Sequence, residues 1–159
     1  MTRRYGWAAP ASASGKRFLS ATGRTLTVLA ALTTAGVLAS MIIESPTDGD
    51  VFLAFLEQVL APRLEPGQVV ILDNQAAQKV DGVGPFIVSR GAHLLYLPPY
   101  SPDFNPIEPA WSKLKQLLRG AKARVLAQLE PAIAHALAAT TPENAQAFFR
   151  HCEYGTQQQ

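Results

Sequence analysis

The fold is decided by two short apolar runs, Val69-Val70-Ile71-Leu72-Asp73-Asn74 and Leu94-Leu95-Tyr96-Leu97-Pro98-Pro99. Four apolar residues bounded by turn signals are typical of a strand that is buried on both faces of a parallel sheet. Between the runs, residues 80–89 contain two glycines and a proline, which predict a short, irregular helix. Strands that alternate with helices predict a mixed α/β layer structure, in which sites form at the carboxyl ends of strands.

Upstream of these runs, residues 25–43 carry no charge over 19 positions and raise the question of a membrane. Their length suits a spanning helix or a signal sequence. However, the segment contains four threonines and a turn-like centre at residues 33–36. We therefore expect a buried hairpin with strands at residues 26–32 and 36–43, and a membrane helix is the alternative.

The remaining elements are predicted from helical spacing and turn residues. Residues 1–20 are mostly small or basic, which predicts loop or weak strand. A helix is expected over residues 51–59, capped by Asp48 or Asp50. Three further helices are expected over residues 105–119, 121–139 and 142–151.

The composition fits one domain that folds around one core. The chain has 159 residues, of which 48% are hydrophobic, and this is enough apolar surface to exclude general disorder. We assign residues 1–153 to the domain and residues 154–159 to a disordered tail. The net charge of +2 permits an anionic partner without requiring one. The single cysteine excludes an internal disulfide and suits a cytoplasmic protein.

Two carboxylates lie at the ends of predicted elements, where an α/β fold can form a functional site. Asp73 follows a predicted buried strand, Glu108 begins a predicted helix, and 34 residues separate them. Carboxylates can hold a pair of magnesium ions for phosphodiester chemistry. Magnesium prefers oxygen ligands and keeps several waters, so few protein ligands are needed.

A longer stretch that ends at Glu108 carries a resemblance to a known family. It reads Leu94-Leu95-Tyr96-Leu97-Pro98-Pro99-Tyr100-Ser101-Pro102-Asp103-Phe104-Asn105-Pro106-Ile107-Glu108. It resembles the hallmark of mariner-type and bacterial insertion-sequence transposases, which are DDE superfamily endonucleases. The Asp73-Asn74 pair and its spacing to Glu108 match the same pattern, and residues 1–7, 52–63 and 111–114 continue the similarity.

The resemblance implies a ribonuclease-H-like mixed sheet flanked by helices, as in retroviral integrases. It implies catalytic, metal-binding roles for Asp73 and Glu108, with Asn74 in support. The expected cofactor is Mg²⁺, with Mn²⁺ as a substitute. The implied reaction cuts DNA at transposon ends and joins the freed 3′-hydroxyl to target DNA. The expected location is the cytoplasm of a bacterium, in association with the nucleoid.

Two departures from the family pattern limit this expectation. The first catalytic Asp of the family lies on a strand just upstream of residues 1–7, so we expect an amino-terminally truncated domain that lacks its first strand and is inactive alone. The upstream half of the transposase, encoded in another frame, is then an expected partner, and a homodimer is a further one. In addition, Gln78 stands where the family commonly has His. The alternatives are a non-catalytic remnant with weak DNA binding and a membrane-anchored small protein.

The helix after the hallmark is expected to place a charged face beside an apolar one. At 100° per residue, Ser112, Lys115 and Arg119 fall within about 40° of Glu108. An apolar stripe lies beside them, formed by Ile107, Trp111, Leu114 and Leu118. We therefore predict that Lys115 and Arg119 contact DNA phosphates.

Each of these residues also has a simpler structural explanation. Glu108 can close a capping box with Asn105, and Asp73 can form an Asx-turn after its strand. Lys115 and Arg119 can be solvated surface charges. The residue patterns alone leave these explanations open, and it is the resemblance to the family that favours the functional roles.

Overall fold

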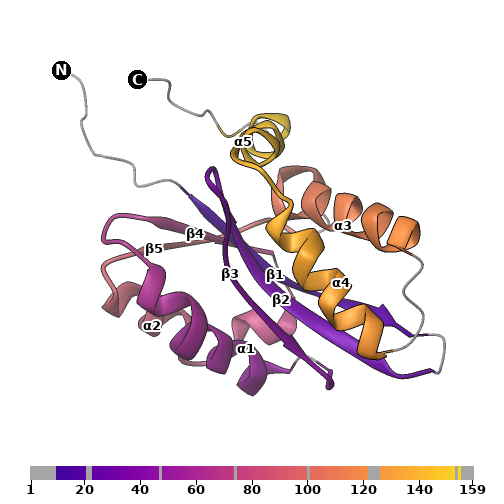
Figure 1. Ribbon diagram of the computed structural model, residues 1–159. Coiled ribbons are helices and arrows are strands. Elements are labelled where there is room, and N and C mark those ends of the chain that lie inside the picture. Colours follow the sequence, from indigo (N-terminus) through magenta and orange to yellow (C-terminus); the bar gives the residue numbers. More distant parts are fainter. Residues whose placement is uncertain are drawn as a thin grey trace.

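The structure is a computed structural model, which describes residues 10–20, 23–46, 48–73, 75–99, 101–121, 126–152 and 154. Its strands form one five-stranded mixed sheet in the order β3-β2-β1-β4-β5 (Figure 1). The strands are β1 (Ala11–Leu19), β2 (Thr25–Thr33), β3 (Gly36–Ile43), β4 (Val69–Leu72) and β5 (His93–Tyr96). β1 is antiparallel to β2 and parallel to β4, and β4 is parallel to β5. The expected mixed α/β sheet is therefore confirmed.

Helices cover both faces of this sheet (Figure 1). One layer contains α1 (Gly49–Phe55), which continues into a π-helical turn (Leu56–Leu60) and a 3₁₀ turn (Ala61–Arg63), and α2 (Val83–Ser89). The other layer contains α3 (Ile107–Ala121), α4 (Leu126–Ala138) and α5 (Pro142–His151). Two more 3₁₀ turns, Ala76–Lys79 and Pro102–Phe104, follow the ends of β4 and β5.

The middle strand is more regular than expected. We expected residues 1–20 to be loop or weak strand, and Ala11–Leu19 is a nine-residue strand between β2 and β4. Its sequence begins Ala-Ser-Ala-Ser-Gly, and none of these residue types favours strands. The strand is stabilised instead by pairing on both sides and by the burial of Ala11–Ser14. Residues 1–9 lie outside the described part of the chain.

The uncharged segment forms the predicted hairpin. β2 and β3 pair antiparallel around a turn at Thr34 and Ala35, and β2 is buried over eight of its nine residues. The membrane-helix alternative is therefore wrong for this segment. Within the described ranges, no helix has the length and apolar character needed to cross a membrane.

The sheet separates two apolar cores. Leu26, Val28, Ala30 and Leu32 of β2 face α3, α4 and α5, whereas Leu29 and Ala31 face α1 and α2. This alternation is the two-residue period of a strand that is covered on both faces. On the α3 side, Ile107, Trp111 and Leu114 are buried in the core, and Leu118 is partly buried against it. The apolar stripe predicted for this helix is therefore confirmed.

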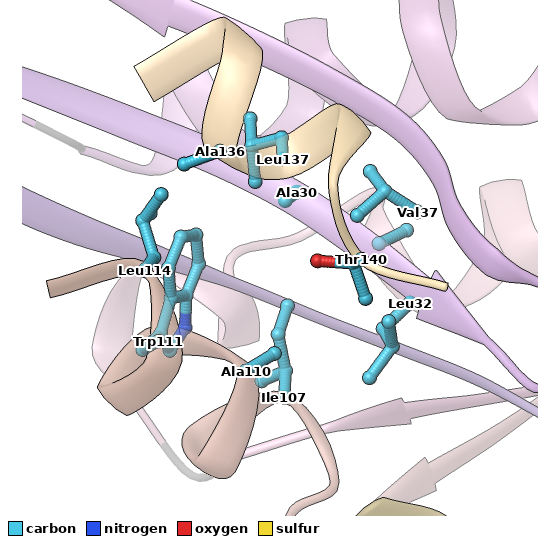
Figure 2. A pocket seen from close by; sticks show the side chains of 11 residues that line it. Ala30, Leu32, Val37, Ile107, Ala110, Trp111, Leu114, Ala136, Leu137 and Thr140 are labelled. Carbon is cyan, nitrogen blue, oxygen red and sulfur yellow. The ribbon is translucent and has the colours of Figure 1, made fainter. Parts of the chain in front are cut away.

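A small cavity remains in the core on the α3 side of the sheet, between α3, α4 and the hairpin of β2 and β3. Figure 2 shows Trp111 and Leu114 of α3 and Ala136 and Leu137 of α4 around it. Its volume is about 10 Å³, which is at most the space of one water molecule. The lining is almost wholly apolar, so we assign this cavity to packing and not to ligand binding.

The ends of the helices show which local signals were informative. The side chain of Asp48 accepts a hydrogen bond from Val51 N at 2.9 Å, as predicted for the cap of α1. Thr141 and Asn144 form a reciprocal capping box at the start of α5. Tyr154, which we assigned to the tail, packs edge-on against Phe149, and its hydroxyl donates to the carbonyl of Phe104. Residues 155–159 lie outside the described part.

Candidate active site

A cleft of about 500 Å³ opens at the carboxyl ends of the parallel strands. Asp73 enters it from the end of β4 and Glu108 from the first turn of α3. The two carboxylates predicted from the sequence are thus brought together in one cleft. The other lining residues are Gln75, Lys79, Leu97, Pro98, Pro99, Ser101, Pro102 and Asn105.

Asp73 forms a turn through its side chain and also lines the cleft. Its Oδ1 accepts a hydrogen bond from Gln75 N at 3.2 Å, which is the Asx-turn that the sequence allowed. Burial raises the pKa of the Asp73 carboxyl, and the negative charge of Glu108 raises it further. The hydrogen bond from Gln75 and the nearby charge of Lys16 act on the pKa in the opposite direction. The pKa of Asp73 therefore responds to the charges of both Glu108 and Lys16.

Glu108 is positioned through Asn105. The backbone N–H of Glu108 donates to the carbonyl of Asn105 at 3.0 Å. The Asn105 side chain does not cap α3, because its Oδ1 accepts the hydroxyl of Ser12 on β1 at 2.5 Å. Pro109 stands in the first turn of α3, where a backbone N–H would have no partner within the helix, so it is tolerated. The start of α3 is thus fixed to the middle of the sheet.

Two cationic side chains lie on the face of α3 that carries Glu108. Lys115 and Arg119 are exposed on α3, as the helical spacing predicted. The positive charge of Lys16 lowers the pKa of Lys115, and Arg119 contributes in the same direction. The charge of Lys16 therefore acts on Lys115 as well as on Asp73.

Three residues of this site were not predicted from the sequence. Lys16 belongs to a segment expected to be loop or weak strand, which gave no direction to its side chain. Asn105 was considered as part of the hallmark and as a helix cap, and Lys79 was given no role. Gln78 itself is buried, and its Nε2 donates to the carbonyl of Ala13 at 3.4 Å. Asn74, the predicted supporting residue, lies outside the described residues.

The donor set does not complete a metal site. Asp73 and Glu108 supply carboxylate oxygens, but within the described ranges no three His, Cys, Asp or Glu side chains are grouped so that they could hold a metal ion. The lining of the cleft also includes a cationic side chain, that of Lys79. The two carboxylates fit a role in metal binding, whereas the set as a whole does not fit a two-ion centre.

The comparison with protein families decides the classification. Residues 1–130, which are most of the chain, match the family described as DDE superfamily endonuclease. The chain belongs to this family. The match covers β1 to α3 and therefore both walls of the cleft. No curated protein sequence matches the chain.

Solved structures place this DDE domain in the ribonuclease-H-like fold. The Mos1 transposase catalytic domain with raltegravir and Mg matches with a TM-score of 0.74 at 12% identity, over 91% of this chain and 80% of that one. The Mos1 paired-end complex with the left transposon end matches with a TM-score of 0.75 at 12% identity, over 94% of this chain and 54% of that one. The intasome of simian T-cell lymphotropic virus has a TM-score of 0.63 at 14% identity, over 82% and 47%. At these identities the likeness concerns the fold.

Proposed function

We propose that this chain is the catalytic-core fragment of a DNA transposase and that its cleft engages DNA at transposon ends. The observation that carries the proposal is the shared cleft of Asp73 and Glu108. Membership of the endonuclease family and the match to transposase catalytic domains support the same function.

In this proposal, Lys115 and Arg119 bind the phosphates of a DNA strand next to the cleft. Both side chains are exposed, and they share one face of α3 with Glu108. Contacts to phosphates give affinity without sequence specificity and weaken as salt concentration rises. The helix would therefore align a strand along the cleft, while base-specific recognition of an end would need other residues.

In this account Asp73 and Glu108 would hold Mg²⁺ or Mn²⁺, which would supply the Lewis-acid chemistry for strand cleavage and joining. The described residues supply two carboxylates and no third group. We therefore propose that the chain does not cleave DNA alone and that the upstream half of the transposase contributes the missing ligand. The incomplete donor set also favours a second candidate, a transposase remnant that binds DNA weakly without cutting it.

A nicking assay separates the two candidates. The chain alone should give no Mg²⁺-dependent nicking of a supercoiled plasmid, whereas a fusion that adds the upstream carboxylate-bearing strand should regain nicking. Asp73→Asn and Glu108→Gln in the fusion should each abolish it, and Asp81→Asn, an exposed carboxylate outside the cleft lining, should not. A fusion that folds and binds DNA but never nicks would support the remnant.

Assembly and location remain part of the proposal. Among the similar structures are a Mos1 paired-end complex and a Mos1 strand transfer complex. By analogy we propose that this chain acts as a homodimer that holds two DNA ends, in the bacterial cytoplasm at the nucleoid. Light scattering with and without end-containing DNA would test the dimer, and a monomer in both conditions would contradict it.

A further inference from the structure

The register of the middle strand brings Lys16 to the edge of the sheet that carries Asp73, although Lys16 is not among the residues that line the cleft. Ala13 of β1 pairs with Leu72, the last residue of β4, in parallel register, so β1 runs on past the end of β4 and past the level of Asp73. Lys16 lies three residues beyond Ala13 along β1. The strand thus carries a basic residue to the edge of the sheet where Asp73 stands.

The face on which Lys16 lies is set by its neighbours in the strand. Trp111 Nε1 donates to Ser14 Oγ at 2.8 Å, and the ring of Phe18 lies 6.4 Å from that of Trp111. Ser14 and Phe18 are the alternate neighbours of Lys16, so all three side chains point to the α3 side of the sheet. Arg17 points to the opposite side.

The position of Lys16 among other charges agrees with this geometry. Its positive charge acts on Asp73 and on Lys115, and Glu108 acts on both of these residues as well. Lys16 is half-buried, so it is less free than Lys115 to turn away into solvent. The charges of these two acids and two lysines, carried by β1, the end of β4 and α3, therefore influence one another.

We propose that Lys16 is a built-in counter-ion of the Asp73–Glu108 cleft and competes there with divalent cations. An ammonium group next to carboxylates neutralises part of their charge and repels a second cation. A fixed positive charge then lies beside the cleft and opposes the binding of a cation between Asp73 and Glu108. This inference rests on the proposed function, since it concerns the metal affinity of the same cleft.

Binding of Mn²⁺ to the purified chain, measured by electron paramagnetic resonance of the free ion, tests the proposal without DNA or turnover. Lys16→Gln should tighten Mn²⁺ binding about tenfold, as expected when one unit charge a few ångströms from a divalent ion is removed in a partly solvated site. Lys16→Met should act in the same way, and Lys16→Glu should tighten binding further because it adds an oxygen ligand. Lys16→Arg, which keeps the charge, should leave the affinity unchanged.

Arg17→Gln is the matched control, because it removes the same charge from the adjacent residue on the other face of the strand. Equal affinities of wild type, Lys16→Gln and Lys16→Met, or an equal gain in Arg17→Gln, would overturn the proposal. Asp73→Asn in the Lys16→Gln background should cancel the gain, and a gain that persists would place the ion outside the cleft and also overturn it. A failure of DNA binding with the Mn²⁺ results as expected would instead refute only the proposed function.

Discussion

Ser12 Oγ donates a 2.5 Å hydrogen bond to Asn105 Oδ1, and this contact joins the middle strand of the sheet to the residue that precedes the helix of Glu108. Both residues are buried, with exposed fractions of 0% and 1%. The carbonyl of Asn105 then accepts the backbone N–H of Glu108. Asn105 therefore couples the position of Glu108 to β1, the strand that runs beside Asp73.

Asn105→Ala should destabilise the fold, because it leaves the Ser12 hydroxyl buried without this partner. A loss of about 1–3 kcal/mol in the free energy of unfolding is expected for an unpaired buried polar group. Ser12→Ala should cost less, and the double variant should cost less than the sum of the two. Urea denaturation monitored by Trp fluorescence measures these values. Strictly additive effects would show that the hydrogen bond contributes nothing.

Asp73→Asn should stabilise the fold at neutral pH. Burial and the charge of Glu108 raise the pKa of Asp73 above its ordinary value of 3.8. The folded state thus binds the proton more tightly than the unfolded state, so Asp73 contributes stability below about pH 3.8 that is lost as pH rises through its raised pKa. The melting temperature of Asp73→Asn should exceed that of wild type by roughly 1–3 °C at pH 7.

The same comparison at pH 3 should show no difference in melting temperature, since the carboxyl is then protonated in both states. Asparagine keeps an oxygen that can accept the hydrogen bond from Gln75 N. Asp81→Asn provides the control, because Asp81 is exposed and lies outside the cleft lining. A lower melting temperature of Asp73→Asn at pH 7 would contradict the assigned electrostatics.

Lys115→Gln and Arg119→Gln should each weaken the binding of a mixed-sequence DNA duplex. Each loss of a phosphate contact should reduce the slope of log affinity against log salt by about 0.9. Fluorescence anisotropy over a salt series measures both affinity and slope. Arg90→Gln is the matched control, because Arg90 stacks over Phe86 at the end of α2, in the opposite helix layer. Unchanged slopes in both α3 variants would exclude these contacts.

Much of the fold could be predicted from local patterns. The uncharged hairpin, the strand Val69–Leu72 and the helix Pro142–His151 each carry a signal within a few residues, either apolar runs or a cap. Asp73 and Glu108 were found through their positions at the ends of such elements. In contrast, β1 has small residues with little strand preference, and its place in the sheet depends on partners far away in sequence.

The sequence alone did not indicate the roles of Lys16 and Asn105, because both depend on partners that are distant in the sequence. Lys16 becomes informative only when the register of β1 against β4 is known, because strand register decides which face and which edge a side chain reaches. Asn105 appeared to be a cap from its local sequence, yet its side chain bonds to Ser12, 93 residues earlier. Long-range pairing of this kind leaves no local pattern to read.

The shared cleft of Asp73 and Glu108 is tested most directly by cross-linking. In a Cys152→Ala background, the pair Asp73→Cys and Glu108→Cys should be joined by a short thiol-specific cross-linker in the native state and not in urea, as read by mass spectrometry. The control pair is Asp73→Cys with Glu57→Cys, since Glu57 is exposed in the opposite helix layer and should not be joined. A native Asp73–Glu108 pair that reacts singly with a maleimide but is never cross-linked would contradict the account.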